Sequence, residues 1–141
     1  MKIKKSQNSQ NPRRGREFEE KVAQILSEKY GMEFKKLPIR IGHPPKEHEF
    51  DLVSQDKKYV IECKCYTWKK NVPAAKMAIL NEAVFYLSHL SNKYRWIVMK
   101  KDFSKRKKKT LAQYYFLTNR HLLDGVKIWE VDENDHIRKI S

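Results

Sequence analysis

The sequence has few cysteines, glycines and prolines, and it has no long apolar run. Its 141 residues include four glycines and five prolines, which excludes repeats of the collagen or linker kind. No apolar segment approaches the ~20 residues that span a bilayer, and the basic N-terminus lacks the apolar stretch of a signal peptide. The two cysteines, Cys63 and Cys65, would lie ~6.6 Å apart along a strand, which is poor geometry for a disulfide. We therefore expect reduced thiols that pack in the interior, and a cytoplasmic protein with no membrane partner.

Acidic side chains are also in the minority. Lys and Arg total 31 against 17 Asp and Glu, a formal net charge of +14, which predicts a polyanionic partner, most often nucleic acid. Residues 1–16 contain six cations and no acid, so we expect a flexible basic arm over 1–12 followed by one domain over 13–141. The cations expected to contact DNA are Arg13, Arg14, Arg16, Lys69, Lys70, Lys105, Arg106, Lys107, Lys108 and Lys109.

Apolar periodicity and turn residues predict alternating helices and strands. Helices are expected over 14–30, 74–90 and 110–123, with Asn71, Pro73 and Thr110 as start signals. Strands are expected over 32–41, 94–99 and 126–131, a proline-marked loop over 43–48, a β-hairpin over 49–65 and a basic loop over 100–109. The order α-β-β-β-α-β-α-β predicts an α/β fold with a mixed central sheet flanked by helices on both faces.

The hairpin carries the chemistry that the sequence predicts. A turn at Asp56-Lys57 gives one face two apolar pairs, Phe50 with Cys63 and Leu52 with Ile61. On the other face Asp51 lies opposite Glu62, and Lys64 follows. Directly opposed like charges are destabilising, so this pair needs a cation between the two carboxylates. Lys64 could supply one, but a divalent metal would match the geometry better.

The first predicted helix adds another carboxylate. On a helical wheel Glu19 falls inside the apolar arc, whereas the other three glutamates of the helix fall outside it. We therefore expect Glu19 to point inward, toward the sheet, where a carboxylate is costly unless it meets a partner.

These residues carry a resemblance to a known family. Asp51, ten intervening residues and then Glu62-Cys63-Lys64 resemble the Asp…(Asp/Glu)-x-Lys motif of the PD-(D/E)xK nucleases, the restriction-endonuclease-like superfamily. The segment 15–19, Gly-Arg-Glu-Phe-Glu, resembles the Gly-x-x-x-Glu start of the first helix in small archaeal-type Holliday junction resolvases. Phe50 stands where the family often has a proline. The predicted element order is similar to the family's core.

The resemblance implies phosphodiester hydrolysis that depends on Mg²⁺, with Mn²⁺ as a possible substitute. By position, Asp51 and Glu62 would hold the metal together with the backbone carbonyl of Cys63. Lys64 would orient the attacking water and stabilise developing charge, while Glu19 would act through a water or a second metal.

We expect a DNA endonuclease that acts as a homodimer, and three readings of its task stay open. The first is structure-selective cutting, as in a junction resolvase, because the chain leaves no room for a separate recognition domain. The second is a compact sequence-specific restriction enzyme. The third, from another class, is a DNA-binding accessory protein with a nuclease fold and little activity of its own.

Overall fold

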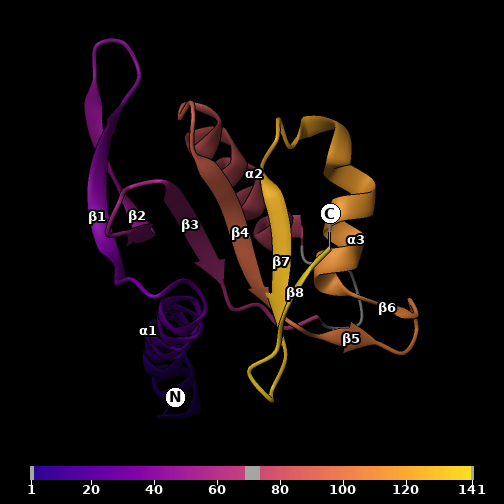
Figure 1. Ribbon diagram of the computed structural model, residues 1–141. Coiled ribbons are helices and arrows are strands. Elements are labelled where there is room, and N and C mark those ends of the chain that lie inside the picture. Colours follow the sequence, from indigo (N-terminus) through magenta and orange to yellow (C-terminus); the bar gives the residue numbers. More distant parts are fainter. Residues whose placement is uncertain (1, 69–73, 141) are drawn as a thin grey trace.

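A six-stranded mixed sheet forms the centre of the molecule, and helices cover both of its faces (Figure 1). The computed structural model describes residues 2–68 and 74–140, with side chains from residue 12 onward. In chain order the elements are α1 (Lys2–Tyr30), β1 (Phe34–Ile41), β2 (Lys46–Ser54), β3 (Tyr59–Lys64), α2 (Ala74–Ser88), β4 (Tyr94–Lys100), β5 (Phe103–Ser104), β6 (Lys109–Thr110), α3 (Leu111–Asn119), the 3₁₀ turn η1 (Arg120–Leu122), β7 (Lys127–Val131) and β8 (Ile137–Lys139).

The sheet has the strand order β1-β2-β3-β4-β7-β8. Its central strands β3, β4 and β7 are parallel, whereas the β1–β2, β2–β3 and β7–β8 pairs are antiparallel. β1 contains Pro38 and lies at an edge of the sheet, where a proline is tolerated because no neighbour needs its missing N–H. The predicted α/β class, with a mixed sheet between helices, is therefore confirmed.

Several predicted boundaries are wrong. β2 begins at Lys46, so the loop expected over 43–48 is shorter. The basic loop expected over 100–109 contains the small β5–β6 hairpin, and β8 was not expected at all. α1 begins at Lys2 rather than at residue 14, and the expected helix start at 71–73 lies outside the described residues. The flexible arm over 1–12 and the single domain over 13–141 stay predictions.

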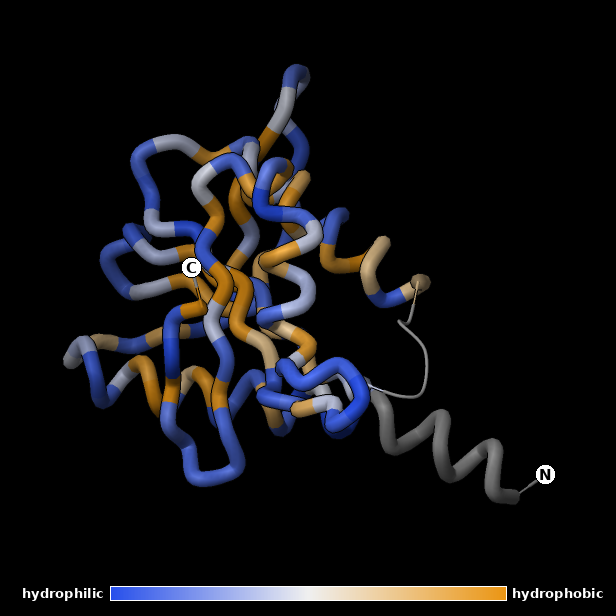
Figure 2. The backbone as a smooth tube through the Cα atoms, turned by 90° about the vertical axis from the view of Figure 1, so that its right-hand side faces the viewer, coloured by the Kyte–Doolittle hydropathy of each residue, from blue (hydrophilic) through white to orange (hydrophobic). Residues whose placement is uncertain are grey.

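Two apolar layers hold the helices against the sheet. Phe18, Val22 and Leu26 of α1 pack on one face, over side chains that include Ile61 and Val98. α2 and α3 pack on the other face, over the alternate side chains of the same strands. Since the parallel strands are covered on both faces, their sequences read as nearly continuous apolar runs. Figure 2 shows hydrophobic stretches of the backbone in the middle of the molecule and mostly hydrophilic stretches at its periphery.

A buried glutamate joins α3, β7 and β8. The Thr110 hydroxyl donates to Glu130 Oε1 at 2.7 Å and accepts from the backbone N–H of Gln113, the first part of a capping box that begins α3. Arg138 Nη2 donates to Glu130 Oε2 at 2.6 Å. Glu130 thus has a hydrogen-bond donor on each oxygen although the residue is 1% exposed.

Parallel pairing brings the ends of β3 and β4 to one edge of the sheet. The chain after β3 lies along this edge: Lys100 Nζ donates to Thr67 Oγ1 at 3.4 Å, and the Trp68 backbone N–H donates to the Asp102 carboxylate. The β5–β6 hairpin extends from the same edge (Figure 1). No helix in the described part of the chain is long and apolar enough to cross a membrane.

Candidate metal and catalytic site

A β-bulge sets the position of Asp51. Lys35 pairs with Val53 and Leu37 pairs with Phe50, so between these two pairs β2 contains one residue more than β1. The carboxylate Oδ2 of Asp51 accepts a 2.8 Å hydrogen bond from the backbone N–H of Cys63. Here the side chain of Asp51, rather than the backbone of β2, is hydrogen-bonded to the backbone of β3. Bulges of this kind commonly redirect a side chain beside an active site.

The bulge explains why the predicted pairing in the β2–β3 hairpin is right at Leu52 whereas the predicted face of Phe50 is wrong. The predicted pairing of Leu52 with Ile61 is confirmed. The predicted common face is wrong, because Phe50 packs in the layer beneath α2 whereas Leu52, Ile61 and Cys63 pack beneath α1. The extra residue in β2 reverses the alternation between positions 50 and 52, which simple period-two reasoning does not anticipate.

Asp51 and Glu62 lie side by side, as the hairpin register predicts. The backbone N–H of Asp51 donates to Glu62 Oε1 at 3.4 Å, and Glu62 is 7% exposed. Burial, and secondly the charge of Asp51, raise the pKa of Glu62 to about 8. Lys64 opposes this shift, but its Nζ lies 3.9 Å from Glu62 Oε2, at the limit of an ion pair. Two carboxylates thus share a site, with the Lys64 ammonium close to Glu62 and the charge of Lys36 near enough to interact with Asp51.

Glu19 faces the sheet, as predicted, but its nearest described cation was not foreseen. Lys36 on β1 lies 3.4 Å from Glu19 Oε1. Burial and then the charge of Asp51 raise the pKa of Glu19, while Lys36 and Lys64 act against that rise. Glu19 is therefore close enough to Asp51 and Lys64 to interact electrostatically with both. The sequence gives no signal for Lys36, because its approach to Glu19 depends on how α1 crosses β1.

Tyr66 and His48 lie near enough to Asp51 to feel its charge. Burial first, and then the charges of Asp51, Glu62 and Glu82, raise the pKa of Tyr66 to about 12. His48 stacks on Tyr86 of α2 with ring centroids 3.9 Å apart, and burial lowers its pKa. Tyr66 could have been suspected from its place two residues after Lys64, whereas the approach of α2 is a tertiary feature without a local sequence signal.

The carboxylates of this site offer part of the ligand shell of a metal ion. Among the side chains that the structure describes, those of residues 12–68 and 74–140, no three His, Cys, Asp or Glu gather closely enough to hold a metal ion by themselves. Mg²⁺ commonly binds through one or two carboxylates and completes its shell with water and substrate phosphate. The Asp51–Glu62 pair fits that requirement because both groups are hard oxygen donors. Burial and the charge of Asp51 raise the pKa of Glu62, and a bound cation would favour its ionised, metal-binding form.

The two cysteines are free thiols. Burial raises the pKa of Cys63, so its side chain packs as an apolar group.

The cations expected to contact DNA lie on two elements of the described structure. Arg13, Arg14 and Arg16 are on α1, where Arg13 and Arg16 are exposed and Arg13 pairs with Glu17 at 3.0 Å. Residues 105–109 lie in the β5–β6 hairpin at the edge where β3 ends. Lys69 and Lys70 lie outside the described residues.

No family model, curated protein or solved structure matches this chain. The residues and their geometry therefore carry the functional argument.

Proposed function

We propose that this protein is a metal-dependent endonuclease of the PD-(D/E)xK type that hydrolyses phosphodiester bonds in DNA. One observation carries the proposal: Asp51 and the buried Glu62 lie side by side at the end of a central strand, with Lys64 beside them. A buried pair of like charges is costly to stability unless a cation neutralises it. Such a pair is expected where its use is to bind a metal.

The order of elements supports the same assignment. An opening helix is followed by three antiparallel strands, a second helix and a strand parallel to the third. The acidic residue on β2 and the Glu-x-Lys sequence on β3 occupy the places that the resemblance to PD-(D/E)xK nucleases implies. Restriction-endonuclease-like topology is therefore part of this proposal.

Each residue has a role that its environment permits. Asp51, Glu62 and the carbonyl of Cys63 would hold the metal, which supplies neutralisation of the phosphate and acidification of water when bound. Lys64, near the carboxylates and partly shielded from solvent, would stabilise the charge that develops in the transition state. Glu19, paired with Lys36, would position a water or a second ion at the edge of the site.

The proposed substrate is branched DNA, cut as by a Holliday junction resolvase, and the proposed active form is a homodimer that supplies one site for each of two strands. The net charge of +14 supports a polyanionic partner.

The test is cleavage of supercoiled plasmid and of a panel of junction, flap and duplex DNA, with Mg²⁺ or with EDTA. We expect Mg²⁺-dependent nicking by the natural protein and none by Asp51→Asn, while both bind DNA equally because no phosphate-binding cation is removed. Asp56→Asn, at the turn of the same hairpin, is the matched control and should cleave normally. Cleavage of one duplex sequence alone would indicate a restriction enzyme, and DNA binding without cleavage would indicate an accessory protein.

A further inference from the structure

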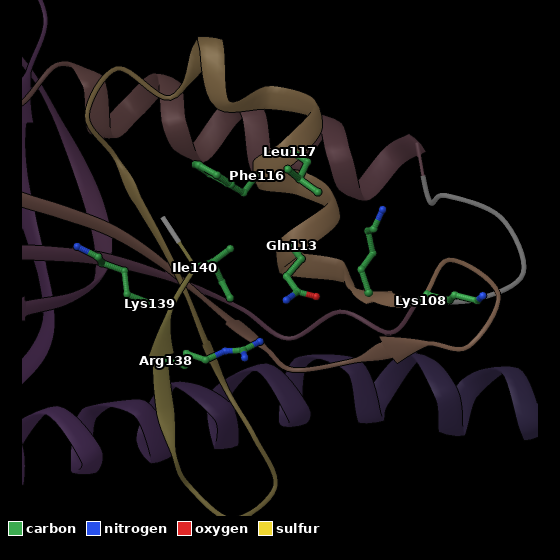
Figure 3. Close-up of a pocket in the computed structure, with 8 residues that line it drawn as sticks. Lys108, Gln113, Phe116, Leu117, Arg138, Lys139 and Ile140 are labelled. Carbon is green, nitrogen blue, oxygen red and sulfur yellow. The ribbon is translucent and has the colours of Figure 1, made fainter.

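A cleft outside the carboxylate site has the shape and lining of a ligand-binding site. A cleft of about 530 Å³ opens between α3 and β8 (Figure 3). Phe116 and Leu117 of α3 and Ile140 after β8 give it an apolar lining, and Leu117 is half-exposed. An aromatic ring with two aliphatic neighbours in an open cleft offers a surface on which a flat apolar group can pack.

Cations surround this apolar lining. Lys108 and Lys109 come from the β5–β6 hairpin, and Arg138 and Lys139 come from β8. The described residues that line the cleft include no acid, and Glu130 beneath it is engaged by Arg138 and Thr110. The cleft therefore suits a ligand that combines negative charge with a flat apolar body.

The walls of the cleft are fixed relative to each other. Glu130 accepts from Thr110, which begins α3, and from Arg138 on β8. One buried carboxylate thereby joins the helix that supplies Phe116 to the strand that supplies Lys139. A cleft held in this way loses little conformational freedom when a ligand enters.

Lys108 stands in a conformation that glycine adopts more readily. Its φ is +56°, and its backbone N–H closes the hairpin turn by donating to the Ser104 carbonyl at 2.7 Å. Left-handed backbone at a residue other than glycine is mildly strained and is often found where the side chain serves a function. Among the described residues, the exposed Lys108 side chain forms no ion pair.

The sheet register relates the cleft to the carboxylate site. Lys64 pairs with Met99, Met99 with Glu130 and Glu130 with Arg138, so Lys64 and Arg138 lie in one row across the sheet. Three strand spacings separate them, about 14 Å. The cleft and the carboxylate site are therefore close enough for one DNA strand to reach both.

We propose that the α3–β8 cleft binds a single-stranded segment of DNA, with an unstacked base against Phe116 and Leu117 and its flanking phosphates on Lys108 and Lys139. Base stacking on an aromatic ring beside cations is the general way in which proteins hold single strands. A duplex keeps its bases stacked and paired, so it does not fill this cleft. The inference rests on the proposed nuclease function for its biological meaning, because it assigns to the substrate a single-stranded flank beside the cut.

The first test removes the Lys108 charge without disturbing the turn. Lys108→Gly keeps the left-handed backbone, and Lys57→Gly is its matched control because Lys57 has φ +62° in the β2–β3 turn at the opposite end of the sheet. Binding of fluorescent oligo(dT) is measured by anisotropy in EDTA at several salt concentrations. For Lys108→Gly we expect the salt slope to flatten by about 0.7 and the affinity at 0.1 M salt to fall about fivefold. The same result with Lys57→Gly would overturn the proposal.

The second test removes the ring. Phe116→Leu should weaken oligo(dT) binding about fivefold or more, leave the salt slope unchanged and leave duplex binding unchanged. Phe103→Leu, an exposed aromatic of β5 outside the cleft, should change none of these. If Phe116→Leu lowers the melting temperature of the protein, Leu117→Ser is used in its place, because Leu117 lines the same cleft and is half-exposed. The same loss of oligo(dT) binding is then expected.

The two proposals can fail separately. A preference for single strands over duplex that survives both cleft variants overturns the cleft, whatever the cleavage assay gives. Loss of single-strand binding in the cleft variants together with absence of Mg²⁺-dependent nicking by the natural protein supports the cleft and overturns the nuclease. All binding is measured with EDTA present, so no measurement of the cleft depends on catalysis.

Discussion

Replacing Glu62 by glutamine should make the metal-free protein more stable in alkaline solution. Glu62 is buried beside Asp51, and its pKa is raised from an ordinary 4.5 to about 8. A glutamine has nearly the same shape as the protonated acid, and its side-chain oxygen can still accept from the Asp51 backbone N–H. The substitution therefore removes the cost of ionising this carboxyl group while keeping its packing.

The magnitude follows from proton linkage. Because the folded-state pKa is raised, the unfolded state releases this proton more readily, and stability is lost as the pH rises from about 4.5 through about 8. Each unit of pKa difference corresponds to about 1.4 kcal/mol. The part of the shift that falls between pH 5 and pH 8 therefore corresponds to about 3 to 4 kcal/mol. Water entry and small rearrangements reduce such costs, and we expect Glu62→Gln to gain about 2 to 4 kcal/mol at pH 8 and less than about 1 kcal/mol at pH 5.

Urea denaturation in EDTA at pH 5 and pH 8 measures both values. All titratable groups other than residue 62 are the same in both proteins, so the difference between the two curves isolates Glu62. Mg²⁺ should stabilise the natural protein at pH 8 and have little effect on the variant, since a ligand that binds the folded state alone raises its stability.

Glu130→Gln is the matched control. Glu130 is also buried, but it accepts hydrogen bonds from Thr110 and Arg138. Its replacement should lower stability by about 1 to 3 kcal/mol at both pH values. The reasoning about Glu62 is refuted if Glu62→Gln lowers the stability at pH 8, because the ionised carboxylate would then be well accommodated without a metal.

Two kinetic predictions follow from the same site. Lys64→Ala should slow single-turnover cleavage by about 10²–10³-fold while leaving Mg²⁺-induced stabilisation in place. The control is Lys58→Ala, at an exposed lysine just before the same strand, and it should cleave at the natural rate. An unchanged rate for Lys64→Ala would assign Lys64 to a surface role. Glu19→Gln should lower the cleavage rate at limiting Mg²⁺ by about 10- to 100-fold, the usual effect of a residue that supports metal ligands. Glu20→Gln, next to it but exposed on α1, should have no effect, and equal rates for the two glutamine variants would remove Glu19 from the site.

The part of this site that could be predicted from the sequence is the part governed by local pairing. A short polar turn fixes the register of the hairpin, so Leu52 opposite Ile61 and Asp51 beside Glu62 follow from counting residues. The inward direction of Glu19 likewise follows from the position of apolar residues around one helix. In each case the neighbours that decide the result are close in sequence.

The rest depends on contacts between distant segments. The bulge at Asp51 is visible only when β1 and β2 are compared, and the Lys36–Glu19 pair only when α1 is laid across β1. β8 has three residues, too few for a periodic pattern, and its place beside β7 depends on the turn after residue 131. The α3–β8 cleft therefore had no sequence signal, although Lys108 and Lys109 stood out as charges.

The two edge strands limit how this protein can associate with other chains. β1, at one edge, contains Pro38 and three cations, and β8, at the other, has three residues of which two are cations. A proline cannot donate a ladder hydrogen bond, and rows of like charge repel an incoming strand of the same sequence. Sheet extension into fibrils or edge-to-edge dimers is thus disfavoured at both ends. Two copies of the chain would therefore associate through side-chain contacts rather than through strand pairing. Exposed apolar side chains such as Phe85 of α2 are available for such contacts.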